Sequence, residues 1–305
     1  MNSSAPFDPS LTIGAFQIGV LVSYVLFGIV TAQTYTYFAK FPDDSPRLKL
    51  LVSIVWVCEV AHALCVGHVL WVFTISDYGR PETLAGAPPK SLDLAILFAG
   101  IVSMSVQSFF TLRIYKLSGH LWISIIIGVI LLLRLVGVVV LIVGGLRMTS
   151  LGNYEAQWGW LLTGVMSIGA GSDLMITAIL VTILLWHRAD GHRRTTTLLD
   201  KIIAWTIETT MLTSGSWIAM LACLVTMKDN FIWLAIFAVT ARVFSNSLLA
   251  SLNSRMTLRA MNELEISLPS VNWTAPPGAL RGNGNTIRSS KQVEAESRCD
   301  DGEQP

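Results

Sequence analysis

Residues 231–255, FIWLAIFAVTARVFSNSLLASLNSR, determine how the rest of the chain must fold. A helix of about 22 apolar-dominated residues, rising about 1.5 Å per residue, crosses the hydrocarbon core of a bilayer. Arg242 lies near the middle of this stretch, and Ser245, Asn246 and Asn253 follow it. Lipid does not solvate such groups, so we expect them to contact polar or charged groups on neighbouring helices.

The composition of the whole chain is that of a membrane protein. Of its 305 residues, 52% are hydrophobic and 13% are charged, whereas charged residues make up about a quarter of a typical soluble domain. The net charge of +1 and the lack of a basic face argue against binding to nucleic acid. We therefore predict an all-α integral membrane protein that is surrounded by the lipid bilayer.

Seven apolar stretches are long enough to span a bilayer as helices. All eleven prolines lie outside these stretches or at their margins, as expected because proline interrupts helical hydrogen bonding. We predict a short extracellular segment at 1–12, a seven-helix transmembrane domain at 13–255 and a largely disordered cytosolic tail at 256–305. The predicted spans are 13–38, 50–75, 92–112, 121–146, 159–186, 202–227 and 231–252.

Lysine and arginine are distributed unevenly between the two sets of loops. Because basic loops are retained in the cytosol, this bias predicts an extracellular N-terminus and a cytosolic C-terminus. We expect the protein in the plasma membrane or another membrane of the secretory pathway. Eleven basic residues lie on the predicted cytosolic side, Lys40, Arg47, Lys49, Arg113, Lys116, Arg188, Arg193, Arg194, Lys201, Arg255 and Arg259, and four lie on the other, Arg80, Lys90, Arg147 and Lys228.

Five ionisable residues lie deep within predicted spans: Glu59, Arg134, Asp173, Glu208 and Arg242. Each costs about 2.5–3.5 kcal/mol at the centre of an inserted helix, so we expect each to face a partner or a water-filled cavity. Arg134, Asp173 and Arg242 lie near the membrane centre by residue count, whereas the two glutamates lie closer to the cytosol. We predict that Asp173 pairs with Arg242 or Arg134. Such a pair is either a structural salt bridge or part of a ligand, ion or proton site.

The second predicted span contains Cys58, Glu59, His62, Cys65 and His68. The two cysteines and His62 share one helix face, and Glu59 and His62 are spaced for a hydrogen bond. Metal binding, a proton-linked Glu-His pair and ordinary packing are three open interpretations. No second cluster of His, Cys or carboxylate appears on another predicted span to complete a zinc site, so we predict no metal and no other cofactor.

Small residues on the first predicted span favour close helix packing. Ala15, Gly19 and Ser23 recur at four-residue spacing. This spacing places them on one helix face, where another helix backbone can approach.

Several motifs in the second half carry a family resemblance. They are Ser172-Asp173 with Ile176, the run TTMLTS at 209–214 and, most specifically, NSLLASLNSR at 246–255, of the form NSLLAxLNxR. These motifs resemble a family of seven-span proteins from mushroom-forming fungi that is classed only as a domain of unknown function. Weaker likeness in the first half extends the resemblance over about 14–255, through Gly28, TAQTY at 31–35, FPD at 41–43, Trp56, Glu59 and His62.

The resemblance implies seven spans and a membrane location but no established activity. The chain departs from the family at three positions. Thr210 stands where the family usually has Gly, and Arg242 and Phe244 stand where Lys and Tyr are common.

Seven spans with an extracellular N-terminus are also the arrangement of G-protein-coupled receptors. We therefore predict a receptor-like or sensor protein that binds a small ligand within the bundle and contacts a cytosolic signalling partner. The alternative is a proton- or solute-coupled transporter. No complete catalytic set is visible, so we predict no enzyme activity. The candidate residues of a ligand or ion site, or of an intramembrane polar network, are Glu59, His62, Arg134, Asp173, Glu208, Arg242, Asn246 and Asn253.

Overall fold

The computed structural model describes residues 10–80, 83, 86–148, 151–189, 193–227 and 230–267. These residues form seven α-helices, with no strand among them. A π-helical turn precedes α1 and another follows α2. The helices are α1 (Ala15–Lys40), α2 (Pro46–Trp71), α3 (Ser91–Ser118), α4 (Leu121–Leu146), α5 (Leu151–Ala189), α6 (Arg193–Thr226) and α7 (Ile232–Ser267), and the π-helical turns are η1 (Ser10–Gly14) and η2 (Val72–Ser76).

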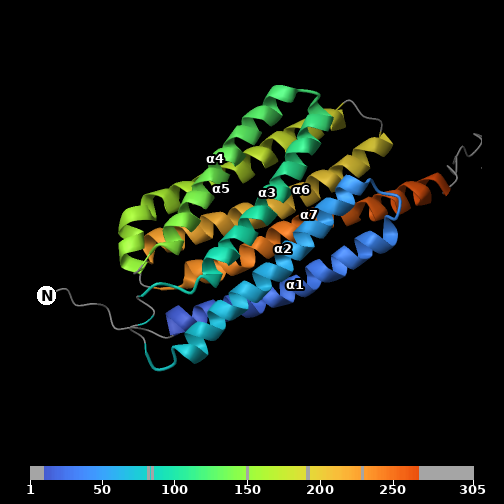
Figure 1. Ribbon diagram of the computed structural model, residues 1–305. Coiled ribbons are helices and arrows are strands. Elements are labelled where there is room, and N and C mark those ends of the chain that lie inside the picture. The colour runs from blue at the N-terminus through green and yellow to red at the C-terminus, as the bar shows by residue number, and fades with distance from the viewer. Residues whose placement is uncertain are drawn as a thin grey trace, which may run out of the picture. The chain divides into compact units, whose positions relative to one another are not determined.

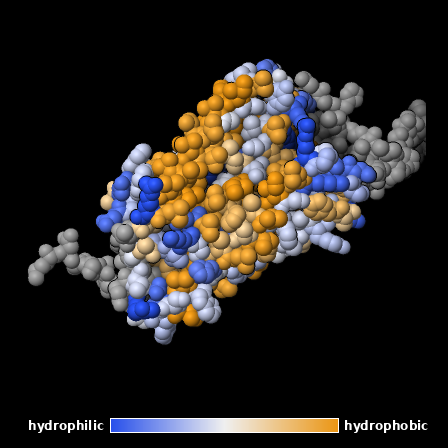
Figure 2. Space-filling view, viewed as in Figure 1, coloured by the Kyte–Doolittle hydropathy of each residue, from blue (hydrophilic) through white to orange (hydrophobic). Residues whose placement is uncertain are grey.

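All seven helices are long and apolar enough to cross a membrane. Large apolar side chains lie exposed along them, as on α4, where Ile125, Leu132 and Val136 are each more than half exposed. Figure 2 shows apolar residues along the flanks of the helices and polar residues toward their ends. Lipid tails solvate such a surface and water does not. The predicted seven-helix integral membrane protein is thus confirmed.

The helices alternate in direction, so the bundle has two ends. The Leu11 end, named here after a residue of η1, holds the first residues of α1, α3, α5 and α7. The Asp44 end, named after the α1–α2 loop, holds their opposite ends. Consecutive helices from α1 to α6 pack against each other, and α3 also packs against α5.

Helix α7 occupies the centre of the bundle. In its most apolar stretch 56% of the residues are buried, against 22–39% in the other spans. It contacts α3 through a hydrogen bond from Arg113 to Ser251 and α6 through the rings of Phe244 and Trp217. Figure 1 shows α7 between α2 on one side and α6 on the other.

Helices α1 and α7 run parallel and approach closely. The backbone N–H of Phe231 donates to the carbonyl of Leu11, and further along the pair Gly19 faces Ala235. A Cβ added at Gly19 would lie 2.6 Å from Ala235 Cα, closer than real Cβ contacts allow. The predicted role of Gly19 in close helix packing is therefore confirmed, and α7 is its partner.

Helix α7 is longer than the predicted seventh span. It continues to Ser267, past residue 256, where the tail was predicted to begin. The sequence MTLRAMNELEIS at 256–267 contains good helix formers and neither Gly nor Pro, so nothing local ends the helix at the membrane boundary. Residues 1–9 and 268–305, which include most of the predicted terminal segments, lie outside the described residues.

We expect the variant Gly19→Ala to lower the thermal unfolding midpoint of the purified protein, because the new methyl group forces α1 away from the α7 backbone. Overpacking of this kind costs about 1–3 kcal/mol. The matched control is Gly28→Ala on the same helix, where an added Cβ has no neighbour within 4 Å. There the change should be neutral or slightly stabilising, since alanine favours helix by about 1 kcal/mol. Equal midpoints for the two variants would contradict the close α1–α7 contact.

Candidate functional site

A buried ion pair joins Arg242 of α7 to Glu59 of α2, and both side chains are fully buried. Arg242 Nη1 also donates to the backbone oxygen of Glu59 at 2.8 Å, and Nε donates to Ser23 Oγ of α1 at 3.1 Å. The second carboxylate oxygen of Glu59 accepts a hydrogen bond from the Ser245 hydroxyl. The ring of Phe27 covers the guanidinium, with 5.1 Å from Cζ to the ring centroid. One charge pair therefore links three helices.

The predicted pairing of Asp173 with Arg242 is wrong, because Glu59 occupies that position. The residue count predicts different depths for Glu59 and Arg242, whereas the structure brings the two side chains into contact. Helix α2 begins at Pro46, four residues before the predicted span, so Glu59 lies near the middle of the helix.

The alternative pairing, of Asp173 with Arg134, is present in an indirect form. Arg134 Nη1 of α4 donates to Gln107 Oε1 of α3 at 2.9 Å. The Gln107 amide nitrogen donates in turn to Asp173 Oδ1 of α5 and, at 3.3 Å, to Ser172 Oγ. All four side chains are buried. The Gln107 amide therefore bridges Arg134 and Asp173 through hydrogen bonds. Gln107 was missed because only ionisable residues were sought in the spans, although a lone amide in an apolar run also signals a buried contact.

Asn246 and Asn253 bind the backbone of α1. Asn253 Nδ2 donates to the carbonyl of Gln33 at 3.0 Å. Asn246 Nδ2 donates to the carbonyl of Leu26 at 3.4 Å and to that of Arg242 in its own helix at 2.9 Å. These hydrogen bonds fix the register of the parallel α1–α7 pair, so both asparagines have a structural role.

Arg255 completes the same motif at the Asp44 end. Its guanidinium forms a two-pronged contact with Asp44, at 3.2 Å and 2.6 Å, and lies over the ring of Phe41 at 4.4 Å. Tyr37 also donates to Asp44, at 3.1 Å. The leucines between the polar positions are buried. The motif at 246–255 is therefore a packing motif that joins α7 to α1 and to the loop that follows α1.

His62 packs against an aromatic ring and forms no hydrogen bond within the described residues. It is fully buried, and within the described part of the chain neither ring nitrogen has a hydrogen-bond partner. The ring of Phe237 packs against it at 5.9 Å. The expected hydrogen bond to Glu59 is not formed, because Arg242 and Ser245 occupy that carboxylate. The residues placed by the structure contain no group of three or more His, Cys, Asp or Glu side chains that could hold a metal.

Glu208 is exposed on α6, so the prediction that it lies deep in the bundle is wrong. Thr206 and Thr213 of the same helix are buried. A residue two positions from Thr206 points about 200° away around the helix, which turns Glu208 outward. It lines a groove of about 570 Å³ at the Asp44 end together with Arg113 and Arg255.

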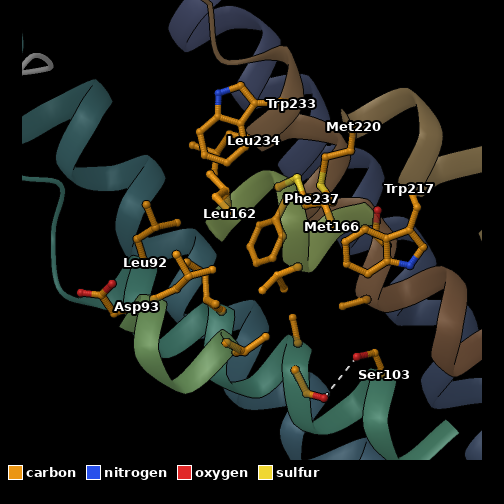
Figure 3. Close-up of a pocket in the computed structure, with 18 of the residues that line it drawn as sticks. Leu92, Asp93, Ser103, Leu162, Met166, Trp217, Met220, Trp233, Leu234 and Phe237 are labelled. Atoms are coloured by element: carbon orange, nitrogen blue, oxygen red, sulfur yellow. Dashed lines mark hydrogen bonds between the residues drawn. The ribbon is translucent and has the colours of Figure 1, made fainter. Parts of the chain in front are cut away.

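A cavity of about 120 Å³ lies among α3, α4, α5, α6 and α7. Its walls are mostly aromatic and aliphatic, and Arg134 and Asp93 are the charged residues that line it. Figure 3 shows Leu92, Asp93 and Ser103 of α3, Leu162 and Met166 of α5, Trp217 and Met220 of α6, and Trp233, Leu234 and Phe237 of α7 around this cavity.

Arg134 lines this cavity. Its Cζ lies 4.7 Å from the centroid of the Trp217 ring, which fixes the guanidinium by a cation–π contact. Its Nε is buried and has no hydrogen-bond partner among the residues described. Nε lies close to Gly169 of α5, where an added Cβ would be 3.3 Å from it. The guanidinium is therefore the cationic group in the cavity wall.

Asp93 and Tyr154 lie toward the Leu11 end of the cavity. Asp93 was not predicted as a site residue, because it follows the first residue of the predicted span and resembled a loop acid. It is 7% exposed and lies against Gly145 of α4. Burial and the charge of Asp93 raise the pKa of Tyr154 to about 12, so the phenol stays protonated and donates to the Leu141 carbonyl at 3.0 Å.

Two double-mutant cycles distinguish the observed charge partner from the predicted one. Removing one member of a buried pair costs about 3–5 kcal/mol. We expect Glu59→Gln and Arg242→Gln to be coupled by at least about 0.5 kcal/mol, and Asp173→Asn and Arg242→Gln to add within about 0.3–0.5 kcal/mol. Unfolding of the three single and two double variants in detergent, beside the parent protein, measures both couplings. A larger coupling in the second cycle would contradict the Glu59–Arg242 pair.

Comparison with known proteins agrees with the resemblance of the second half. Residues 169–257 match the family described as "Family of unknown function (DUF6534)". The matched segment contains Asp173, all of α6 and the packing motif at 246–255. No curated protein and no solved structure matched the chain. Residues 169–257 are therefore similar to the DUF6534 family, to which no function is assigned.

Proposed function

We propose that the chain is a receptor-like membrane protein that binds a small, mostly apolar ligand within its helix bundle. The observation that supports this proposal is the cavity of about 120 Å³, with its aromatic walls and Arg134 in its lining. Binding sites for small molecules are typically apolar with a few placed polar groups. No catalytic role is part of the proposal.

The size of the cavity limits the ligand. An apolar cavity of about 150 Å³ in another protein binds benzene, so a space of about 120 Å³ suits one aromatic ring or a short aliphatic chain. Arg134 Nη1 already donates to the Gln107 amide oxygen, and the walls of the cavity are mostly apolar. An uncharged ligand with one acceptor oxygen fits such a site. The favoured ligand is a small alcohol, aldehyde or ketone.

The proposed orientation is an extracellular N-terminus and a cytosolic C-terminus, in the plasma membrane or another secretory membrane. The basic residues at the Asp44 end support it. The cavity lining includes Pro88 and Met148 near the Leu11 end, which would face away from the cytosol. The groove with Glu208 and Arg113 would then be available to a cytosolic signalling partner. The sequence resemblance supports a source among mushroom-forming fungi.

We expect an epitope tag at the N-terminus to be labelled by antibody on intact cells, and a tag at the C-terminus to be labelled only after permeabilisation. The asymmetry of basic residues across the helix ends is the physical reason. Each tagged chain serves as the control for the other, and the reverse labelling pattern would overturn the orientation.

Transport is the second candidate function, and a row of separate cavities favours it. The ligand cavity shares Phe244 with a small cavity near Asp173, and that cavity shares Phe110 and Thr206 with the groove at the Asp44 end. Together they extend along α3, α6 and α7 toward both ends of the bundle. Flux of a bound compound into proteoliposomes would identify a transporter, whereas binding without flux favours a receptor.

We expect benzyl alcohol and benzaldehyde to raise the thermal midpoint more than toluene, because they carry an acceptor for the Arg134 guanidinium. A ligand at about 100 times its Kd stabilises by about 2.7 kcal/mol. The stabilisation should disappear in Gly100→Leu, which fills the cavity from α3; a Cβ there makes only an ordinary contact of 3.5 Å with Val138.

The control for this experiment is Gly128→Leu on α4, where an added Cβ has no neighbour within 4 Å. It should retain the effect of each compound. Equal effects in the two leucine variants would place binding outside the cavity and contradict the proposal.

A further inference from the structure

A second, much smaller cavity encloses part of Asp173. It has a volume of about 20 Å³, enough for one body the size of a water molecule. It lies among α3, α5, α6 and α7, and oxygen-bearing side chains make up much of its lining. These are Gln107, Asp173, Thr177, Thr206, Thr210, Thr213 and Ser247.

Asp173 lines this cavity, and one oxygen of its carboxylate is unsatisfied. Oδ1 accepts the amide of Gln107. Oδ2 is buried and has no hydrogen-bond partner in the described part of the protein, and the whole residue is 5% exposed. A buried acceptor left in this state costs about 1–3 kcal/mol, and more when it is charged. An occupant that presents positive charge to Oδ2 would therefore stabilise the site.

Two threonine hydroxyls near Asp173 also bond to the helix backbone. The Thr206 hydroxyl donates to the carbonyl of Ile202 at 2.7 Å. The Thr213 hydroxyl donates to the carbonyl of Thr210 at 3.1 Å and also lies within hydrogen-bonding reach of the Asp173 carboxylate. Because a hydroxyl has two lone pairs as well as one hydrogen, both can offer lone pairs to the cavity. The polar part of the lining thus consists of oxygen-bearing side chains beside one carboxylate.

Glu59 and Asp173, two of the buried carboxylates of the bundle, differ in their charge partners. Glu59 is in direct contact with Arg242. Asp173 has Arg134 only at the far side of the Gln107 amide. An ionised carboxylate in a low-dielectric site without a cation in contact is unfavourable, and a small cation that binds oxygen removes this cost.

We infer that this cavity binds one Na⁺ ion, with the Asp173 carboxylate and the surrounding hydroxyl oxygens as ligands. A single carboxylate matches a monovalent ion. A divalent Mg²⁺ would retain several waters, for which a cavity of about 20 Å³ has no room. The neighbouring groove shares Thr206 and Phe110 with the cavity and lies on the side of the Asp44 end. This inference does not rest on the proposed ligand or on the receptor role.

The test compares thermal unfolding of the purified full-length protein in NaCl and in N-methyl-D-glucamine chloride at equal ionic strength. Ion binding to the folded state raises the midpoint in a saturable manner. We expect Na⁺ to do so in the parent protein and to have no effect in Asp173→Asn. Thr210→Val and Ser247→Ala each remove one lining oxygen. Each variant should need at least about tenfold more Na⁺ to reach the same stabilisation.

The matched control is Thr182→Val, which removes an exposed hydroxyl of α5 that donates to its own helix in the same way as Thr206. It should retain the response of the parent. If Asp173→Asn does not fold, the Na⁺ responses of Thr210→Val and Ser247→Ala are compared with that of Thr182→Val instead. Equal midpoints in the two salts for the parent would show that water fills the cavity, and an unchanged Na⁺ response in the lining variants would place the ion elsewhere. Either result overturns the inference.

Discussion

The ion pair between Arg242 and Glu59 is the contact on which the arrangement of the bundle depends. A guanidinium at the centre of α7 cannot face lipid, so α7 must be surrounded by helices that provide acceptors. Glu59 of α2 and Ser23 of α1 provide them. This requirement accounts for the central position of α7 and for its higher burial than the other spans. The asparagine contacts and the Asp44–Arg255 pair then fix the same helices along their length.

The bundle divides its polar contacts between two regions. Around α1, α2 and α7, polar side chains bind each other or the backbone directly and hold helices together, although Arg242 Nη2, Asn246 Oδ1 and Asn253 Oδ1 are also buried without a hydrogen-bond partner among the described residues. Among α3, α4, α5 and α6, Arg134 and Asp173 are joined only through Gln107, and each retains a buried polar atom without a partner in the described residues. Both cavities lie beside this second network. A ligand gains the most binding free energy where it provides a hydrogen-bond partner for a buried polar group beside a cavity that otherwise has none.

The sequence predicts the spans well and the partners poorly, for separate physical reasons. Insertion into a bilayer depends on the length and apolarity of each segment, which are local properties, so all seven spans could be identified. The partner of Arg242 depends on which helices are neighbours and on the first residue of α2. The sequence signals neither clearly, and Asp173 was chosen in place of Glu59. The position of Glu208 along its span does not determine which face of α6 it occupies. Gln107 carries no charge, so its need for a buried partner is a weaker signal in the sequence.

The parallel contact of α1 with α7 joins the two ends of the transmembrane chain. Ser23 and Arg242 are separated by 219 positions, and Glu59 and the Arg242 guanidinium by 183. During synthesis, α1 and α2 enter the membrane long before the residue that neutralises Glu59 has been translated. The growing chain must therefore hold an uncompensated acid until its last span arrives. Assembly is completed by that span, and a chain that ends before α7 leaves Glu59 without its arginine, a feature by which membrane quality control can recognise an unfinished protein.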